Sequence, residues 1–333
     1  MKKRIEKLFR LLCVGGLALS WTHGAWAQAS AAAFPIKRVH IIVPGPPGAA
    51  TDALARGLAE YLRPKLGQTV VVENRPGATG IIGTAFFAKA PADGYTLLLT
   101  NSDPVVLNPL LYNKLPYDAE RDLQPVANLG IVSGVVLAHP SVRANTVIDL
   151  LELGKSKPGS IKWATFGNGS FVHVYSEWLS NTRGAAFLSV PYRGGGPAFQ
   201  AAIAGEVEAT IFGIGPAVPL IESGRLKPLA ILGPKRSTLL PNVPTLAEQG
   251  FPNYITTWLG LFAPRGTPGD VVDKINGLVN QAMRDPGFKA SILDPQTIDP
   301  MTQSADEFAE FIRKDRSIVG PIVRASNVQM SMN

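Results

Sequence analysis

The strongest constraint on the fold is a strand-like run that stops at a proline- and glycine-rich loop and continues as a helix. Residues 39–43 are mostly apolar and β-branched, residues 44–48 read Pro-Gly-Pro-Pro-Gly, and apolar residues recur at helical spacing from Leu54. A helix that opens after such a loop presents unpaired backbone N–H groups and the positive end of its dipole at one point. The segment therefore predicts a place for an anion such as a carboxylate, with an ordinary strand-to-helix turn as the alternative.

Strands and helices alternate along the rest of the chain. We expect further strands at 69–73, 95–100, 132–138, 162–165, 189–192 and 209–212, and helices at 79–90, 145–155, 271–283 and 305–318. Such alternation is typical of a mainly parallel sheet, in which the loops at the carboxyl ends of the strands line the ligand crevice. The chain is longer than one core usually serves, so we expect two α/β domains, with the last third packed on the outside of one of them.

The amino terminus is typical of a secretory signal peptide at residues 1–27. Basic residues crowd the first ten positions, an apolar stretch follows at 11–19, and Ala25-Trp26-Ala27 forms a cleavage site. We therefore expect export by the general secretion route and cleavage after Ala27. The single cysteine, Cys13, lies inside this peptide, so the exported protein is expected to fold without disulfides.

Composition argues against several classes of function. The formal net charge is +7, but much of it lies in the signal peptide, and the other basic residues are scattered, so nucleic acid is not an expected partner. The histidines have no partners at metal-ligand spacing, and the phosphate- and dinucleotide-binding glycine motifs are absent. No later apolar run reaches the length of a membrane-spanning helix. We expect no metal and no cofactor.

An ordered set of short motifs runs through the chain that would remain after cleavage. In order, the main ones are Phe34-Pro35, Ile42-Val43-Pro44, Val71-Val72-Glu73-Asn74-Arg75-Pro76-Gly77, Asp93-Gly94-Tyr95-Thr96, Gly167-Asn168-Gly169-Ser170, Val190-Pro191-Tyr192-Arg193-Gly194, Pro241-Asn242-Val243-Pro244-Thr245 and Trp258-Leu259-Gly260-Leu261. Each motif alone is weak, but together they form a specific set. The set resembles the Bug family of periplasmic solute-binding proteins, the receptors of tripartite tricarboxylate transporters.

The resemblance implies an α/β, type II periplasmic-binding-protein fold with two lobes, a central cleft and two crossover segments. The first lobe would comprise residues 34–131 and 255–333, and the second lobe residues 132–254. A protein of this kind would capture a small organic carboxylate in the periplasm. It would deliver the ligand to the membrane permease subunits of a tripartite tricarboxylate transporter, or signal to a sensor kinase. We expect a monomer without enzymatic activity.

The resemblance also implies which loops hold the ligand, through backbone amides and ordered water. Carried over position by position, the grip on the carboxylate falls on Gly48, Ala49, Ala50, Thr51 and Asp52, on Gly167, Asn168, Gly169 and Ser170, and on Phe212 and Gly213. Asn101, Ser102 and Asp103 follow another strand and complete the predicted site.

Three departures from the family pattern bear on the ligand. Gly45 stands where relatives usually carry an aromatic residue, and Gly48-Ala49 stands where they usually carry two glycines. We hypothesise that Gly45 opens space for a bulkier acid, including an aromatic one, and an unchanged dissociation constant in a Gly45→Phe variant would contradict this. Asp103 adds a carboxylate where small hydroxyl residues are common. It would either meet an ammonium or hydroxyl donor of the ligand or cap the next turn.

An exported hydrolase on a similar two-lobed fold is the alternative function. It would need a nucleophile and a base, and the only candidates are Ser170 and His173, which lack an evident acid partner. A histidine beside a glycine-rich loop is more often a hydrogen-bonded structural residue. The role of Arg75 stays open between a salt bridge across the lobes and a solvent-facing position.

Overall fold

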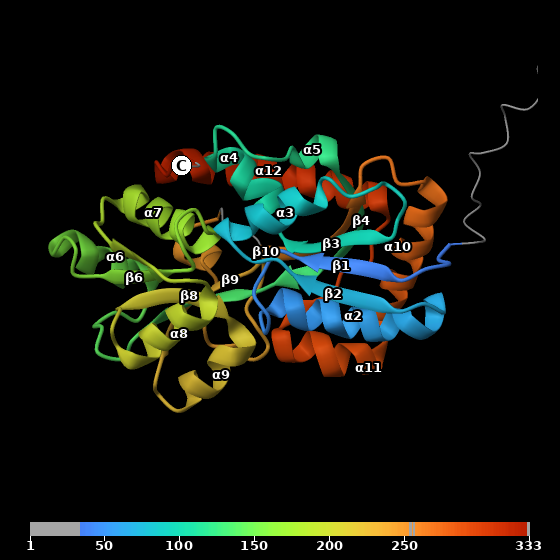
Figure 1. The fold of residues 1–333 in the computed structure, drawn as a ribbon. Coiled ribbons are helices and arrows are strands. Elements are labelled where there is room, and N and C mark those ends of the chain that lie inside the picture. The colour runs from blue at the N-terminus through green and yellow to red at the C-terminus, as the bar shows by residue number, and fades with distance from the viewer. Residues whose placement is uncertain (1–33, 253–254, 256, 332–333) are drawn as a thin grey trace, which may run out of the picture.

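The computed structural model describes residues 34–252, 255 and 257–331. The predicted signal peptide and its cleavage site lie outside these residues. The described chain forms two β-sheets, each covered by helices, as two α/β lobes that lie side by side (Figure 1). This is the predicted two-lobed α/β architecture.

The first sheet has the strand order β11-β4-β10-β3-β1-β2. Its strands are β1 (Val39–Val43), β2 (Val70–Asn74), β3 (Thr96–Asn101), β4 (Leu123–Val132), β10 (Thr257–Pro264) and β11 (Ile298–Asp299). β1 pairs in parallel with β2 and β3, whereas β10 is antiparallel to both β3 and β4. The prediction of a mainly parallel sheet is therefore wrong for three of the five strand pairings in this sheet. β10 enters at the end where β4 leaves for the second lobe, so it must run opposite to β4.

The second sheet has the strand order β7-β6-β8-β5-β9. Its strands are β5 (Gly134–Ala138), β6 (Lys162–Thr165), β7 (Leu188–Pro191), β8 (Ala209–Gly213) and β9 (Lys227–Leu232). β6 is parallel to β7 and β8, while β5 is antiparallel to β8 and β9. β5 starts where the chain arrives from the first sheet, so it also runs against its neighbours. Both sheets are mixed.

Strand positions in the parallel parts follow the sequence pattern closely. The runs predicted at 69–73, 95–100, 162–165, 189–192 and 209–212 correspond to β2, β3, β6, β7 and β8 within one residue at each end. The strands β4, β9, β10 and β11 were not predicted, and the run at 132–138 is divided between β4 and β5. Pro125 and Gly260 weaken the local strand signal of β4 and β10, and pairing with neighbours restores it.

Helices cover both faces of each sheet (Figure 1). The longer ones are α2 (Ala50–Leu66), α3 (Ile81–Phe87), α6 (Val147–Ser156), α7 (Phe171–Arg183), α8 (Gly195–Ala204), α9 (Ile214–Glu222), α10 (Gly269–Arg284) and α12 (Ala305–Ser326). Short turns are α4 (Asn108–Leu111), α5 (Ala119–Asp122), α11 (Pro286–Phe288) and the π-helical turn η3 (Asp103–Leu107). Within the part of the chain that the structure describes, no helix has both the length and the apolar composition to cross a membrane.

The last helix joins the two lobes. Its buried residues include Val319, Ile322 and Val323, beyond the end predicted at 318, and they belong to a core that also contains side chains of α7. The Asn181 Nδ2 group of α7 donates to the carbonyls of Ala325 and Ser326 at 3.2 and 3.0 Å. The expectation that the last third packs on one domain is therefore wrong for α12. Its apolar stripe is long enough to reach the second lobe.

The carboxyl ends of several strands meet where the two lobes adjoin. β4 ends at Val132 and β5 begins at Gly134, so these two ends of the sheets are one residue apart. Asn101 at the end of β3 lies opposite Leu259 near that point, and Gly213 at the end of β8 lies opposite Gly134. We call this region the interlobe edge. The loops after β1, β3, β6, β7 and β8 therefore emerge there, because parallel strands end at the same edge of their sheet.

Candidate functional site

The loop before α2 is held by a buried carboxylate. Asp52 is only 4% exposed, and its Oδ2 accepts from the Gly48 N–H at 2.9 Å and from Arg56 Nε at 3.0 Å. Burial alone would raise the pKa of Asp52, but the bonds from Arg56 and Gly48 outweigh it and hold the pKa below its usual value. Gly48 has φ +80°, which favours glycine. Asp52 thus fixes the conformation of the loop that precedes α2.

A second bridge fixes the same loop from β2. Arg56 Nη2 donates to Asn74 Oδ1 at 3.0 Å, and Asn74 Nδ2 donates to the Gly45 carbonyl at 3.2 Å. Neither Arg56 nor Asn74 was among the predicted site residues, although Asn74 stands in one of the sequence motifs. A Cβ at Gly45 would lie 3.1 Å from Thr51 Oγ1, so Gly45 lets the loop approach the start of α2.

Arg75, in the same motif, stays within the first lobe. It pairs with Glu73 at 2.6 Å, and its guanidinium carbon lies 3.5 Å from the centre of the Phe86 ring. Of the two roles considered, the structure shows no bridge across the lobes for Arg75, whose side chain is partly exposed to solvent at 37%. It shows a local contact on the surface of α3.

Three helices begin at the interlobe edge without a side-chain cap. The residues before α2, α8 and α9 are Ala49, Gly194 and Gly213, and none of them accepts a bond from the first turn among the described residues. By contrast, α6, α7 and α12 are capped by Thr146, Ser170 and Ser304. The first N–H groups of a helix have no acceptor within the helix. In α9 the Gly215 N–H donates to Thr297 Oγ1 at 3.4 Å, and Pro216 has no N–H to offer. The starts of α2 and α8 therefore offer donors to an anion, one from each lobe.

The glycine-rich loop before α7 bonds to itself. Ser170 is 2% exposed, and its Oγ donates to the Gly167 carbonyl at 2.8 Å and accepts from the His173 N–H at 3.4 Å. The Gly169 N–H donates to His173 Nδ1 at 3.1 Å, and burial lowers the pKa of His173, so the ring is neutral with its proton on Nε2. The hydroxyl and the imidazole do not bond to each other. The arrangement gives no support to a hydrolase.

The loop after β3 is buried at the interlobe edge. Ser102 and Asp103 are 3% and 5% exposed. The carboxylate of Asp103 does not cap the turn that follows it. Burial raises the pKa of Asp103 to about 7, although the neighbouring Phe171 N–H and Asn101 side chain lower it in part. Ser102 and Asp103 are therefore packed inside the protein.

Aromatic rings line the second lobe next to these loops. The Phe166 ring lies 5.6 Å from that of Phe171 and 6.0 Å from that of Phe212, both edge to face, and Phe212 stacks on Phe199 at 4.0 Å. A Cβ at Gly195 would lie 3.1 Å from the Phe212 ring, so the rings pack against the start of α8. Phe212 was a predicted ligand residue. Phe166, Phe171 and the start of α8 were not, although a strand ends directly before Phe166.

The predicted residues therefore fall into two groups. The half-buried or exposed members are Gly48, Ala49, Ala50, Thr51, Asn101, Gly167, Asn168, Phe212 and Gly213. The buried members are Asp52, Ser102, Asp103, Gly169 and Ser170. The buried members hold loops or pack between the lobes, so they shape the site rather than face it.

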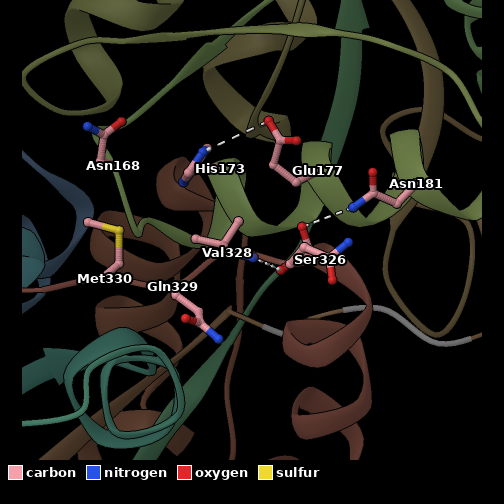
Figure 2. A pocket seen from close by; sticks show the side chains of 9 residues that line it. Asn168, His173, Glu177, Asn181, Ser326, Val328, Gln329 and Met330 are labelled. Carbon is pink, nitrogen blue, oxygen red and sulfur yellow. Dashed lines mark hydrogen bonds and ion pairs between the residues drawn. The ribbon is translucent and has the colours of Figure 1, made fainter.

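A cavity of about 510 Å³ lies beside α7, next to the predicted loops (Figure 2). It is lined by Asn168, His173, Glu177 and Asn181 from the second lobe and by residues 326–330, at the end of α12 and directly after it. His173 Nε2 lies 3.9 Å from Glu177 Oε1. Only Asn168 of the predicted ligand residues lines this cavity. The cavity lies where α12 joins the lobes and is separate from the uncapped helix ends.

Comparison with known proteins identifies the family. The model described as "Tripartite tricarboxylate transporter family receptor" matches residues 54–328. Protein BugT of Bordetella pertussis (strain Tohama I) is 36% identical over 323 residues, which cover 96% of this chain and 98% of BugT. The structure of R. palustris Rpa4515 with adipate has a TM-score of 0.81 and 28% identity, covering 90% of this chain and 100% of that one. MatC (Rpa3494) from Rhodopseudomonas palustris with bound malate has a TM-score of 0.78 and 29% identity, covering 87% and 100%.

These similarities extend over nearly the whole described chain and agree with the order of motifs in the sequence. The family consists of solute-binding receptors, and BugD, another structural neighbour, is a periplasmic binding protein. The chain belongs to the tripartite tricarboxylate transporter receptor family.

Proposed function

We propose that this protein is a periplasmic receptor that binds a small organic carboxylate between its lobes. It would pass the ligand to the membrane permease subunits of a tripartite tricarboxylate transporter. One observation carries the proposal: the starts of α2 and α8, one in each lobe, lie at the interlobe edge without a side-chain cap. The adipate on Rpa4515 and the malate on MatC support a carboxylate as the ligand class.

The contacts suggest how binding would move the lobes. A carboxylate at the α2 start would accept from the N–H groups of the first turn, and the start of α8 would donate from the other side. Contacts to both lobes favour a closed state by the difference in affinity between the closed and open states. A micromolar dissociation constant corresponds to about −8 kcal/mol, which a few charge-assisted hydrogen bonds and buried apolar area can supply.

The finer assignments belong to the same proposal. The receptor would be exported and cleaved after Ala27, and it would act as a monomer. Its lobes would comprise residues 34–131 with 255–333 and residues 132–254, a division that the strand membership of the two sheets supports. The ligand would be held by the half-buried loops named above, with Asp52 and Arg56 keeping the first loop in shape.

Substitution of Ala50 by proline tests the proposal at a single donor. Ala50 is the first residue of α2, and Ala49 before it is extended (φ −72°, ψ 162°), which suits a following proline. Ala50→Pro removes one N–H that faces the predicted anion and leaves the helix intact. We expect carboxylate affinity to fall about tenfold, the worth of one charge-assisted hydrogen bond, with little change in melting temperature.

Ala305 supplies the matched control for this experiment. It is the first residue of α12, and Ser304 before it is also extended (φ −65°, ψ 165°). Ala305→Pro should leave binding unchanged in calorimetry with a panel of mono-, di- and tricarboxylates. Equal affinity in Ala50→Pro and the unmodified protein would remove α2 from the site. Failure of folded protein, freed of carried-over ligand, to bind any acid would overturn the proposed function.

A further inference from the structure

The cavity beside α7 lies between segments of the two lobes (Figure 2). It has a volume of about 510 Å³, and α7 forms one wall of it. The opposite wall is the segment 326–330, which is tied to the first lobe because the Met330 N–H donates to the Leu111 carbonyl of α4 at 3.1 Å. A molecule bound in this cavity would therefore contact both lobes, at a place other than the starts of α2 and α8.

The walls of this cavity carry a negative charge. Among the described residues that line it, Glu177 has the one acidic side chain, and none is a lysine or an arginine. The Glu177 side chain is 28% exposed, and its Oε1 accepts from Ser189 Oγ at 2.5 Å. His173 is neutral, since burial lowers its pKa and its Nδ1 accepts from the Gly169 N–H. Its Nε2 lies 3.9 Å from Glu177 Oε1, beyond hydrogen-bond distance, so His173 does not neutralise the carboxylate.

The end of α12 adds to the preference for a positive charge. This helix is 22 residues long, and its last residue, Ser326, and the following Asn327 line the cavity. The C-terminal end of a helix carries a partial negative charge, which stabilises a cation close to it. On the α7 side, Asn181 Nδ2 donates to the carbonyls of residues 325 and 326 at 3.2 and 3.0 Å, which leaves Asn181 Oδ1 as an acceptor.

The basic residues nearest in the sequence to these helix ends lie outside the cavity. The guanidinium carbon of Arg183, in the last turn of α7, lies 5.4 Å from the centre of the Phe251 ring. Arg324, in the last turn of α12, extends back along its own helix, since its Nη1 would lie 3.4 Å from a Cβ at Gly320. Neither arginine lines the cavity, so the Glu177 charge is the one that a ligand would meet.

We propose that this cavity is a second ligand site, distinct from the carboxylate site, and that it binds a small primary ammonium compound. A primary ammonium group has three donors and no acceptor, which matches the Glu177 carboxylate and Asn181 Oδ1. Val328 and Met330 supply apolar surface for a short alkyl chain. The described lining contains no aromatic ring, so it suits a primary ammonium, which donates hydrogen bonds, better than a quaternary one.

Butylamine and butan-1-ol provide a matched pair of probes, because they are equal in length and differ in charge. Each would be titrated by calorimetry into the unmodified protein at about pH 7, where an alkyl amine is protonated, and at low ionic strength, where screening is weak. We expect saturable binding of one butylamine per protein. Its affinity should exceed that of butan-1-ol about tenfold or more, the worth of one charge-assisted hydrogen bond.

Three variants locate the binding. Glu177→Gln removes the charge and keeps an oxygen that can accept from Ser189 Oγ, so butylamine affinity should fall about tenfold or more. Gln329→Trp places a large side chain in the opposite wall and should also lower the affinity about tenfold. Glu152→Gln is the matched control, because Glu152 is an exposed residue of α6 in the same lobe and does not line the cavity. It should bind butylamine as the unmodified protein does.

The results decide this site separately from the receptor function. Absence of butylamine binding, equal affinity for butan-1-ol, or unchanged butylamine affinity in a folded Glu177→Gln protein overturns the proposal. If Glu177→Gln does not fold, unchanged affinity in Gln329→Trp overturns it. Weaker butylamine binding in Glu177→Gln and Gln329→Trp, with Glu152→Gln unaffected, supports the proposal. None of these outcomes bears on the carboxylate site at the starts of α2 and α8.

Discussion

The starts of α2 and α7 look alike in sequence and differ in structure. Each follows a strand and a glycine-containing loop, and each lies at the interlobe edge, one in each lobe. At α2, Ala49 provides no cap, and Asp52 folds back to bind the Gly48 N–H before the helix. At α7, the Ser170 side chain caps the helix and accepts from the His173 N–H at 3.4 Å. Whether a helix start can hold an anion therefore depends on which acceptors the protein already places at its first N–H groups.

The largest expected effect comes from loss of the carboxylate that shapes the α2 loop. Asp52→Ala removes the acceptor of the Gly48 N–H and the partner of Arg56, so the loop loses its form. We expect carboxylate binding to be lost in calorimetry and the free energy of unfolding to fall by about 2–3 kcal/mol in urea denaturation. Arg56 is half exposed, which limits the cost of leaving it unpaired.

Glu60 on the same helix provides the control for Asp52. It pairs with Arg63 at 2.6 Å, and both side chains are exposed. Glu60→Ala should change stability by about 0.5 kcal/mol or less and leave affinity unchanged. If Asp52→Ala bound the ligand as tightly as the unmodified protein does, the shape of the α2 loop would not matter for ligand binding.

The second prediction concerns the pH dependence of stability that the buried carboxyl group of Asp103 would cause. Burial raises the folded-state pKa of Asp103 to about 7, against an unfolded value of 3.8. Between these two values the folded protein binds the additional proton, so stability falls as pH rises from about 4 to about 7, and the loss is complete above it. Around Asp103, the Tyr117 hydroxyl donates to the Pro104 carbonyl, Arg316 of α12 donates to the Val105 carbonyl, and His173 of α7 is neutral.

Chemical denaturation across this pH range would measure the effect. Asp103→Asn should be more stable than the unmodified protein at about pH 8 by about 2 kcal/mol, and the difference should shrink toward pH 5. Burial also raises the pKa of Asp315 to about 6, so some decline in stability with pH should remain in the variant. A variant with the same pH profile as the unmodified protein would show that Asp103 titrates normally.

The smallest effect is expected at the α7 cap. Ser170→Ala removes the acceptor of the His173 N–H and should lower the free energy of unfolding by about 1 kcal/mol. Because the side chain is buried and bonded within its own loop, ligand affinity should change less than in Ala50→Pro. Calorimetry on both variants would sharpen the comparison. An equal loss of affinity in Ser170→Ala and Ala50→Pro would mean that the start of α7 contributes to ligand binding as much as the start of α2.

Much of the fold could be predicted because its signals are local. The apolar runs that form β2, β3, β6, β7 and β8 end at glycine-, proline- or small-residue loops. The predicted ends of these strands agree with the structure within one residue. The strands β4 and β10 could not be predicted in this way. They owe their place to hydrogen bonds with neighbours far away in the sequence, and these also make the sheet mixed.

The same distinction between local signals and contacts of distant segments applies to the candidate site. By itself the sequence determined that several loops at strand ends would expose backbone donors, that the chain carries a family-specific order of motifs, and that Asp103 is an added carboxylate. Only the tertiary structure decided that Asn74 and Arg56 hold the α2 loop, that α12 joins the lobes, and that Asp103 is buried. Local patterns set which groups a loop can offer, but packing between distant segments decides which of those groups are left free.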